Sequence, residues 1–283
     1  MKNRFLVLGS TGQLGRAFQK ALTREDEKHF FLSHQDLDIT DIDKLTRCIK
    51  EIKPTVVINC TAYNDVDLAE KKSEDAFRIN ATAVQNLADV AHKSNIFLIN
   101  YSTDYVFDGA KHTLYTEQDT PSPLNCYGQS KLAGERALEG ILKDYLLFRV
   151  SWVFGKGERN FLAKATKWAS AQKEIRIAQD EVSIPTFTDD IVNATLLACT
   201  KGMSGLYHLT NTEHCSRYDW VRFYFEKKGF NNRIIPVSSD DFHLAAKRPK
   251  FSAMANSQLC LALKSSIPSW QEAVMRFVQM EEK

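Results

Sequence analysis

The amino-acid sequence predicts an α/β fold, with a doubly wound parallel sheet followed by a smaller C-terminal lobe. Short apolar runs alternate with segments of helical period through the first half of the chain. This alternation is typical of βαβ units joined by right-handed crossovers. After residue 150 the alternation weakens, which indicates that a different substructure begins there.

Each expected strand is an apolar run long enough for one buried strand. These runs cover residues 4–8, 30–32, 55–59, 96–100 and 145–150. Between them, residues 42–52 place Leu45 and Ile49 on one helical face, and a long helical stretch runs from Ala69 to Val90. Because ligands of such sheets bind at the carboxyl ends of the strands, we expect the loops after the strands to form one site.

The first strand ends in a turn that contains three glycines, Gly9, Gly12 and Gly15. An amphipathic stretch with Leu14 and Phe18 follows, so the order is strand, glycine turn, helix. In that order the glycines permit a tight turn, close approach of the backbone to a pyrophosphate, and close helix–strand packing. The motif therefore predicts a Rossmann-type dinucleotide site, with the phosphates at the start of the helix.

The second half of the chain has shorter and less regular elements. Helices are expected at 161–170, 189–199 and 218–228, with short strands near Ile175 and Tyr207. We expect residues 1–150 to form the dinucleotide-binding domain. Residues 151–283 are expected to form a substrate-binding lobe that is interleaved with the end of the sheet.

Composition argues against several kinds of partner. The 283 residues carry a net charge of +2 with both signs interspersed, so neither nucleic acid nor an anionic membrane is an expected partner. No apolar run approaches the ~20 residues of a membrane helix, and no signal-peptide pattern precedes the first strand. We therefore expect a cytoplasmic protein. Six cysteines without C-x-x-C spacing argue against a zinc site and a disulfide framework.

Tyr127 and Lys131 form the most informative pair in the sequence, within Tyr-Gly-Gln-Ser-Lys. Positions four apart share one helical face, so the phenol and the ammonium can point into one site. A nearby cation stabilises phenolate and lowers the pKa of a tyrosine. The pair predicts a tyrosine acid that protonates an oxygen, with lysine as its electrostatic partner. Such a pair also occurs by chance on surface helices, and the glycine turn favours the functional interpretation.

The motifs together resemble the extended short-chain dehydrogenase/reductase family over nearly the whole chain. The segments that carry the resemblance are residues 9–15, 66–70, 101–109, 121–135, 148–154 and 205–209. Within that family the sequence is similar to enzymes that reduce the C4 ketone of a nucleotide-linked 4-dehydro-6-deoxyhexose. The resemblance implies hydride transfer from NAD(P)H, and the substrate that it favours is dTDP-4-dehydro-L-rhamnose. Such enzymes supply sugars for cell-surface polysaccharide.

The resemblance also assigns roles to individual residues. Tyr127 would donate a proton to the developing alkoxide, Thr103 would hydrogen-bond the same oxygen, and Lys131 would hold the nicotinamide ribose and lower the pKa of Tyr127. The implied cofactor-binding residues are Gly9, Thr11, Gly12, Gln13, Leu14, Gly15, Asp38, Ile39, Ala62, Tyr63, Tyr127 and Lys131. The implied substrate-binding residues are Asn64, Val66, Thr103, Asp104, Trp152, Asn160 and Arg248.

Departures from the family pattern shape three further expectations. Ser33 and His34 stand where an acidic residue would favour NAD, so NADPH is the expected cofactor, with NADH as a second option. Some members dimerise through glutamates around magnesium. Ala17 occupies one such position, so no metal is expected and a homodimer is left open. Phe251 replaces a small polar residue after the Arg-Pro pair, which bears on the shape of the substrate pocket.

Alternatives to this reductase remain. A 4,6-dehydratase needs an Asp-Glu pair after the threonine, whereas Asp104 is followed by Tyr105. A 4-epimerase needs a pocket in which the keto sugar can rotate. A reductase for a dihydrostreptose-like or 6-deoxytalose-like product has the same chemistry as the favoured enzyme. A non-catalytic subunit, similar to the regulatory subunit of methionine adenosyltransferase, would keep the fold and use the dinucleotide site structurally.

Overall fold

The computed structural model describes residues 3–23, 29–158 and 160–281 and contains a six-stranded parallel sheet. The strand order is β10-β5-β4-β3-β1-β2. The strands are β1 (Phe5–Leu8), β2 (Phe30–Leu32), β3 (Val56–Asn59), β4 (Phe97–Thr103), β5 (Tyr145–Val150) and β10 (Gly205–His208). In the register of the central pair, Val56 lies opposite Phe97 and Asn59 opposite Asn100.

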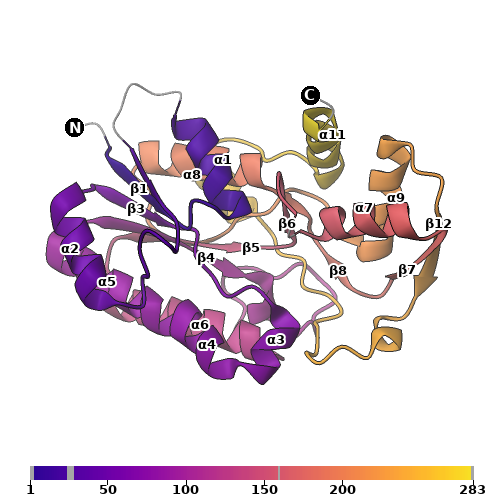
Figure 1. Cartoon of the computed structure of the whole chain (residues 1–283), viewed down its shortest axis with the longest axis horizontal. Coiled ribbons are helices and arrows are strands. Elements are labelled where there is room, and N and C mark those ends of the chain that lie inside the picture. The colour runs from indigo at the N-terminus through magenta and orange to yellow at the C-terminus, as the bar shows by residue number, and fades with distance from the viewer. Residues whose placement is uncertain (1–2, 24–28, 159, 282–283) are drawn as a thin grey trace.

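Helices cover both faces of this sheet (Figure 1). One layer contains α1 (Gln13–Leu22), α8 (Thr188–Thr200) and α10 (Ser257–Leu263). The other contains α2 (Ile42–Ile52), α5 (Ala83–Ser94) and α6 (Cys126–Ile141). Each layer buries its own apolar cluster against the strands, and this burial is the main force that stabilises such a fold. Within the described ranges, no helix is long and apolar enough to cross a membrane.

The predicted doubly wound α/β fold is confirmed, but the long helical stretch between Ala69 and Val90 is broken. It consists of α3 (Val66–Lys71), α4 (Ser73–Phe77), a π-helical turn (Arg78–Thr82) and α5. The chain leaves the helical conformation at Lys72, with φ −125° and ψ 52°. The π-turn places Asn80 against α6, where a Cβ on Gly134 would collide with the Asn80 carbonyl oxygen.

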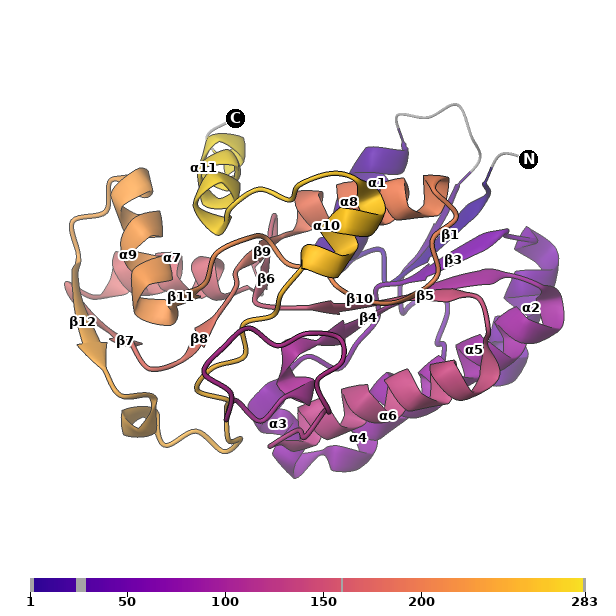
Figure 2. The same cartoon turned by 180° about the vertical axis from the view of Figure 1, so that it is seen from behind.

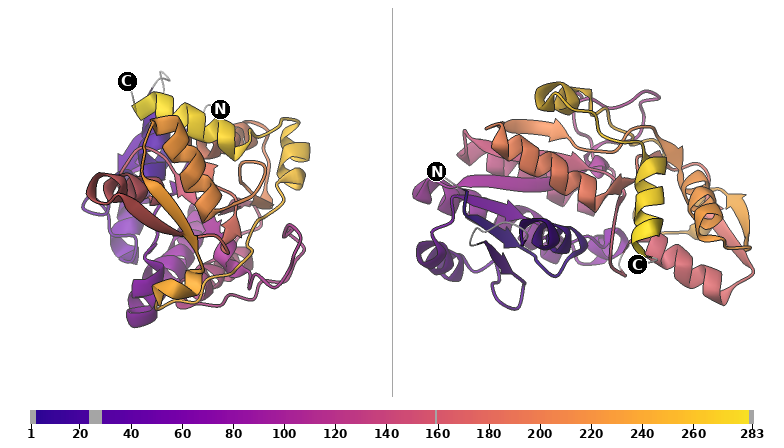
Figure 3. Two further views of the ribbon diagram at one scale, coloured as in Figure 1. Left: turned by 90° about the vertical axis from the view of Figure 1, so that its right-hand side faces the viewer. Right: turned by 90° about the horizontal axis from the view of Figure 1, so that it is seen from above.

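A smaller substructure lies beyond the carboxyl ends of the strands (Figure 2). Its strand pairs are β6 (Val153–Phe154) with β9 (Thr186–Phe187), β7 (Glu174–Ala178) with β12 (Arg233–Val237), and β8 (Val182–Ser183) with β11 (Cys215–Ser216). Its helices are α7 (Phe161–Ala171), α9 (Arg217–Lys228) and α11 (Trp270–Glu281). Aromatic residues such as Trp220 and Phe277 fill its core. Figure 3 shows α11 where the two parts meet, against α9 and β9.

One segment, residues 246–255, runs between the two parts, and we call it the crossing segment. The backbone amide of Val182 donates to the Lys250 carbonyl at 2.8 Å, and the amide of Ser252 donates to the Val182 carbonyl at 2.9 Å. Further along, the amide of Ala255 donates to the Tyr115 carbonyl at 2.7 Å. The crossing segment therefore joins β8 of the smaller substructure to the long loop that follows β4.

A buried ion pair connects helix α6 to the sheet. Arg149 on β5 donates to Glu135 on α6, with Nη2 and Oε2 2.7 Å apart. Both side chains are almost fully buried, with 4% and 2% of their surfaces exposed. The Arg149 guanidinium also lies 5.2 Å from the centre of the Phe107 ring. A charge buried in this way is tolerated only while its counter-ion stays in place.

Replacing this counter-ion should destabilise the protein strongly. In Glu135→Gln the Arg149 charge loses its compensation, so the free energy of unfolding should fall by about 3 kcal/mol or more. Urea denaturation measures the difference. The matched control is Glu158→Gln, which breaks an exposed pair with Lys167 and should change stability by less than about 0.5 kcal/mol. Equal small effects of the two substitutions would contradict the role given to the buried pair.

Candidate active site

The carboxyl ends of four neighbouring strands bring the predicted residues to one edge of the sheet. In the order β5-β4-β3-β1, these strands end at Val150, Thr103, Asn59 and Leu8. These strand ends and the segments that follow them contain all of the predicted site residues except Asp38, Ile39 and Arg248. Separate parts of the sequence therefore form the walls of a single site, as expected for a sheet of this type.

The glycine turn after β1 permits close backbone contact. Gly9 has a φ of +75°, and a Cβ on Gly15 would collide with the Gly9 carbonyl oxygen. Gly12 is the N-cap of α1, so the first-turn amides of this helix have no partner within it. Together with the positive end of the helix dipole, this cradle fits the pyrophosphate of a dinucleotide.

The residues that begin α1 also link the turn to its surroundings. Gln13 and Leu14 supply the first two free amides of the helix. The Gln13 side chain donates from Nε2 to the Val153 carbonyl at 3.1 Å, which ties the turn to the smaller substructure. The Leu14 side chain packs against the apolar cluster under this face of the sheet. Thr11 lies exposed in the turn.

In the loop after β2, the carboxylates of Asp36 and Asp38 accept hydrogen bonds from neighbouring residues of the same loop. The Asp36 carboxylate accepts from the Ser33 amide at 2.8 Å and from the Ser33 hydroxyl at 2.6 Å. Asp38 Oδ1 accepts from the amide and the hydroxyl of Thr40, at 2.9 and 2.8 Å. The Ile39 side chain is buried in the second apolar cluster, so its backbone is the part available to line a ligand.

Ala62 and Tyr63 follow β3, and the side chain of Asn80 holds this segment. Asn80 Oδ1 accepts from the Tyr63 amide at 2.9 Å, and Nδ2 donates to the Tyr63 carbonyl at 3.0 Å. The same Nδ2 donates to Ser130 Oγ at 3.0 Å. Sequence reasoning missed Asn80 and Ser130, because the partners of Asn80 lie 17 and 50 residues away in the chain.

Helix α6 begins close to the end of β4. Asn125 caps the helix by accepting from the Gly128 amide at 2.8 Å, and its Nδ2 donates to the Lys247 carbonyl at 2.8 Å. A Cβ on Gly128 would collide with the Tyr105 carbonyl oxygen. The helix therefore packs directly on the turn after Thr103, and the Tyr105 and Tyr127 rings meet edge to face with centroids 5.9 Å apart.

Tyr127 and Thr103 are brought together by this packing. The Thr103 hydroxyl lies close enough to the Tyr127 phenol to influence its pKa. Burial raises the pKa of Tyr127 above its ordinary value, the Thr103 hydroxyl opposes that rise, and the charge of Asp104 adds to it. The phenol therefore keeps its proton at neutral pH, which is the form that a proton donor requires.

Lys131 lies on the same face of α6 and is almost completely buried. Its Nζ donates to the Tyr101 carbonyl at 2.6 Å. Burial lowers the pKa of Lys131 to about 8, and the charge of Glu135 opposes the decrease. The prediction that Lys131 lowers the pKa of Tyr127 is wrong for this arrangement, because burial disfavours the phenolate and the ammonium is bound to a backbone carbonyl.

Two predicted substrate residues lie where the smaller substructure begins. Trp152 has a φ of +40°, an uncommon conformation for a large side chain. Its ring stacks on Trp220 with centroids 5.7 Å apart, and the Arg217 guanidinium lies 4.1 Å from its centre. Asn160 caps α7 by accepting from the Ala163 amide, and it donates to two carbonyls of the preceding loop.

Arg217 is a charged residue of this region that sequence reasoning missed. Its Nε donates to Glu181 at 2.7 Å, and its side chain lies close enough to Tyr105 for the two to influence each other's pKa. Nothing in the sequence near Arg217 marks it, since Glu181 and Tyr105 both lie on distant segments.

Arg248 forms a two-point ion pair across the site. Its Nη2 donates to Asp67 Oδ2 at 2.6 Å and its Nη1 to Asp67 Oδ1 at 3.2 Å. Asp67 lies on α3 next to Val66, so the pair connects the crossing segment to this helix; Asn64 lies exposed just before it. The Phe251 ring packs edge to face on His214 with centroids 5.5 Å apart and borders the apolar cluster around Phe107.

Asp104 differs from the other predicted substrate residues in its burial. Only 2% of its surface is exposed. One carboxylate oxygen lies within hydrogen-bond distance of three serine hydroxyls, those of Ser151, Ser183 and Ser252. The Asp104 carboxylate is thus directed into the protein.

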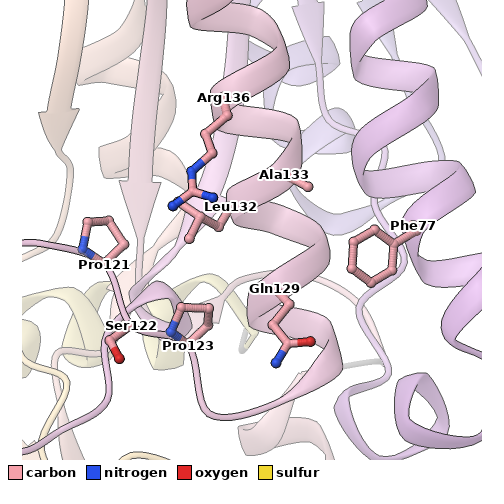
Figure 4. Close-up of a pocket in the computed structure, with 8 residues that line it drawn as sticks. All are labelled: Phe77, Pro121, Ser122, Pro123, Gln129, Leu132, Ala133 and Arg136. Carbon is pink, nitrogen blue, oxygen red and sulfur yellow. The ribbon is translucent and has the colours of Figure 1, made fainter.

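A separate cavity of about 400 Å³ lies on the opposite face of α6 (Figure 4). It is lined by Phe77, Pro121, Ser122, Pro123, Gln129, Leu132, Ala133 and Arg136. On a helix, Gln129 and Ala133 point away from the face that carries Tyr127 and Lys131. This cavity is therefore not the site formed by the strand ends.

Comparison with known proteins agrees with this geometry. The family model described as the RmlD substrate binding domain matches residues 3–282. A dTDP-4-dehydrorhamnose reductase of Sinorhizobium fredii is 30% identical over 286 residues, which cover 97% of this chain and 96% of that protein. A dTDP-4-keto-6-deoxy-D-glucose reductase of Streptomyces niveus is 31% identical over 276 residues, with coverage of 97% and 96%.

A solved structure with a similar level of sequence identity also has the same fold. The crystal structure of the dTDP-4-dehydrorhamnose reductase of Bacillus anthracis, in complex with NADP, has a TM-score of 0.96 and 34% identity, and the match covers 100% of both chains. The full-length matches to sequence relatives and the shared fold lead to one conclusion. The chain belongs to the RmlD family of NAD(P)-dependent sugar-nucleotide reductases.

Proposed function

We propose that this protein reduces the C4 ketone of dTDP-4-dehydro-L-rhamnose to give dTDP-L-rhamnose, with NADPH as the hydride donor. The observation that carries the proposal is that Tyr127 and Lys131 share one face of α6, that the start of this helix packs on the turn after Thr103, and that the glycine turn lies at the same edge of the sheet. The names of the relatives support a keto-sugar nucleotide as substrate. Because one relative is named for a different keto sugar, the identity of the sugar is the part of the proposal that needs the most direct test.

The proposed mechanism gives each residue one task. The bound nicotinamide supplies the hydride. Tyr127 donates its proton to the oxygen that becomes an alkoxide, and Thr103 hydrogen-bonds that oxygen. Lys131, while protonated, holds the ribose hydroxyls. The amides at the start of α1 hold the pyrophosphate.

The proposal divides the remaining residues between two units. Residues 1–150 bind the dinucleotide, with Asp38 and Ile39 beside the adenine and Ala62 and Tyr63 along its length. Residues 151–283 cover the sugar nucleotide. The residues proposed to line that pocket are Asn64, Val66, Trp152, Asn160 and Arg248. The Arg248 guanidinium, now paired with Asp67, suits the diphosphate in shape and charge.

NADPH is proposed over NADH from the loop after β2. An acidic side chain that bonds the ribose 2′-hydroxyl favours NAD. Here the acidic residue that follows β2 is Asp36, and its carboxylate is bonded to Ser33 within its own turn. We also propose that the protein works in the cytoplasm, where its cofactor and sugar nucleotides are found, and that a homodimer is compatible with the site.

The direct test is a substrate panel assayed with both reduced cofactors. We expect oxidation of NADPH that depends on dTDP-4-dehydro-L-rhamnose, with slower turnover of GDP- and CDP-linked 4-ketohexoses and with NADH. Absorbance of the reduced nicotinamide measures the rate. Conversion of a dTDP-hexose without net oxidation of the cofactor would indicate a dehydratase or an epimerase instead. Failure with every keto sugar, together with copurification of a synthetase, would favour the non-catalytic subunit.

Tyr127→Phe should keep the cofactor site and lose most of the activity. The substitution removes only the phenolic oxygen, so kcat should fall by roughly 10²–10⁴-fold, the usual contribution of a positioned acid. NADPH fluorescence titration should give an affinity within about twofold of the parent. An unchanged kcat would show that another group supplies the proton.

Lys131 should make cofactor binding depend on pH. Burial lowers its pKa to about 8, so the ammonium is present below this pH and is lost as the pH rises through it. We expect the dissociation constant of NADPH to increase over that interval, as measured by fluorescence. Lys131→Met should bind more weakly and show no such dependence. A parent protein whose affinity is flat around pH 8 would contradict the role of this ammonium.

A further inference from the structure

The carboxylate of Asp104 is placed at the centre of a cluster of hydroxyl groups. Its Oδ2 lies 2.5 Å from Ser252 Oγ, 2.9 Å from Ser183 Oγ and 3.3 Å from Ser151 Oγ. Ser151 and Ser183 are also bonded to each other, with their oxygens 2.5 Å apart, so one of these two hydroxyls gives its proton to the other. Oδ2 therefore receives the proton of Ser252 and one proton from the Ser151–Ser183 pair, and these two donors satisfy it.

The serines come from different parts of the molecule. Ser151 follows β5 of the main sheet, Ser183 ends β8 of the smaller substructure, and Ser252 lies in the crossing segment. Asp104 itself begins the turn after β4. One side chain therefore fixes both substructures against the strand end that carries Thr103.

The second carboxylate oxygen faces the proposed catalytic residues. Thr103 Oγ1 donates to Asp104 Oδ1 at 3.2 Å, longer than the usual O–H···O distance of about 2.7–2.8 Å. The same Thr103 hydroxyl lies near the Tyr127 phenol and lowers its pKa, since the first turn of α6 packs directly on the turn after Thr103. At this distance the carboxylate holds the Thr103 proton only loosely, so the proton can turn to a nearby oxygen that carries a full negative charge.

We propose that Asp104 is a positioning residue that acts through Thr103. While ionised, its carboxylate holds the Thr103 hydroxyl beside Tyr127, and the three serines set how tightly it does so. When negative charge develops on the substrate oxygen, the Thr103 proton turns from Asp104 to that oxygen. No covalent bond forms or breaks in this step. The inference rests on the proposed function and replaces a substrate-binding role for the Asp104 carboxylate.

The role depends on ionisation of Asp104, because a protonated carboxyl would donate a hydrogen bond instead of accepting one. Burial raises the pKa of Asp104, while the hydrogen bonds from Ser252, Ser183 and Thr103 oppose the rise. The other groups that interact with it by charge are Arg217 of α9, Tyr105 of the same turn and Tyr127 of α6. Activity should therefore be lost as the pH falls through the pKa of Asp104.

The first test is Asp104→Asn, which keeps the shape and removes the charge. We expect kcat to fall by up to about 100-fold, the effect of a misplaced reacting group. The KM for the sugar nucleotide and the affinity for NADPH should stay within about twofold, and the decline of kcat on the acidic side should disappear. The proposal would be overturned if Asp104→Asn had the kcat of the parent and lost activity at low pH in the same way. It would also be overturned if kcat/KM fell only because KM for the sugar nucleotide rose.

The second test uses Ser183→Ala and Ser252→Ala, which keep the charge and remove one donor each. Loss of a donor raises the pKa of Asp104, so the acidic decline of kcat should move to higher pH. A purely structural role would lower kcat at every pH without moving the decline, and that result would overturn the proposal. Ser170→Ala removes an exposed hydroxyl that bonds only within α7 and is the matched control.

A measurement without substrate separates this inference from the proposed function. With carboxyl-labelled aspartate, the Asp104 resonance is identified by NMR from its loss in Asp104→Asn. It should titrate above the ordinary range of aspartate and move further up in Ser183→Ala. If the protein reduced no keto sugar but this titration were found, the proposed function would be wrong. The inference that the serines set the pKa of Asp104 would still hold. An Asp104 titration that the serine substitutions leave unmoved would overturn the inference whatever the activity.

Discussion

Close packing of helix α6 on the end of β4 is the constraint on which the rest of the site depends. Gly128 allows it, because a Cβ there would collide with the Tyr105 carbonyl. Gly134 likewise lets the π-helical turn at Asn80 pack on the same helix. The buried pair of Glu135 with Arg149 holds this helix to β5 further along. Two glycines and one ion pair therefore fix where α6 places Tyr127 and Lys131 relative to the strand ends.

Burial affects the two titrating residues of α6 in opposite directions. It raises the pKa of Tyr127 and lowers that of Lys131, so each is shifted toward its neutral form. The tyrosine consequently retains the proton that it is proposed to give. The lysine loses its charge above a pKa of about 8, so its charged form is present over a narrower pH range than that of an ordinary lysine. The carbonyl of Tyr101 orients its side chain. The structure therefore does not pair the Tyr127 phenol with the Lys131 ammonium, and the function we propose gives the two side chains separate tasks.

Much of this arrangement could be predicted from the sequence, and the rest depends on long-range contacts. Apolar runs located the strands of the main sheet, the glycine turn followed from its spacing, and Tyr127 and Lys131 followed from their separation of four residues on a helix, whereas Thr103 was assigned from the family resemblance. The break at Lys72 and the π-turn at Asn80 were missed, because they follow from the fit against α6 and not from the helical period. Arg217 and the serines around Asp104 were missed for a similar reason: their partners lie on distant segments and no local spacing identifies them.

The late position of two elements has a consequence for how the chain is made. β10 closes one edge of the main sheet, and Ser252 completes the surroundings of Asp104. A ribosome synthesises both only after it has made the glycine turn and helix α6. Until then β5 is an edge strand with unpaired backbone groups, and Asp104 lacks one of its hydroxyl partners. The nascent chain should therefore pass through an aggregation-prone stage, in which chaperone binding near β5 would matter most.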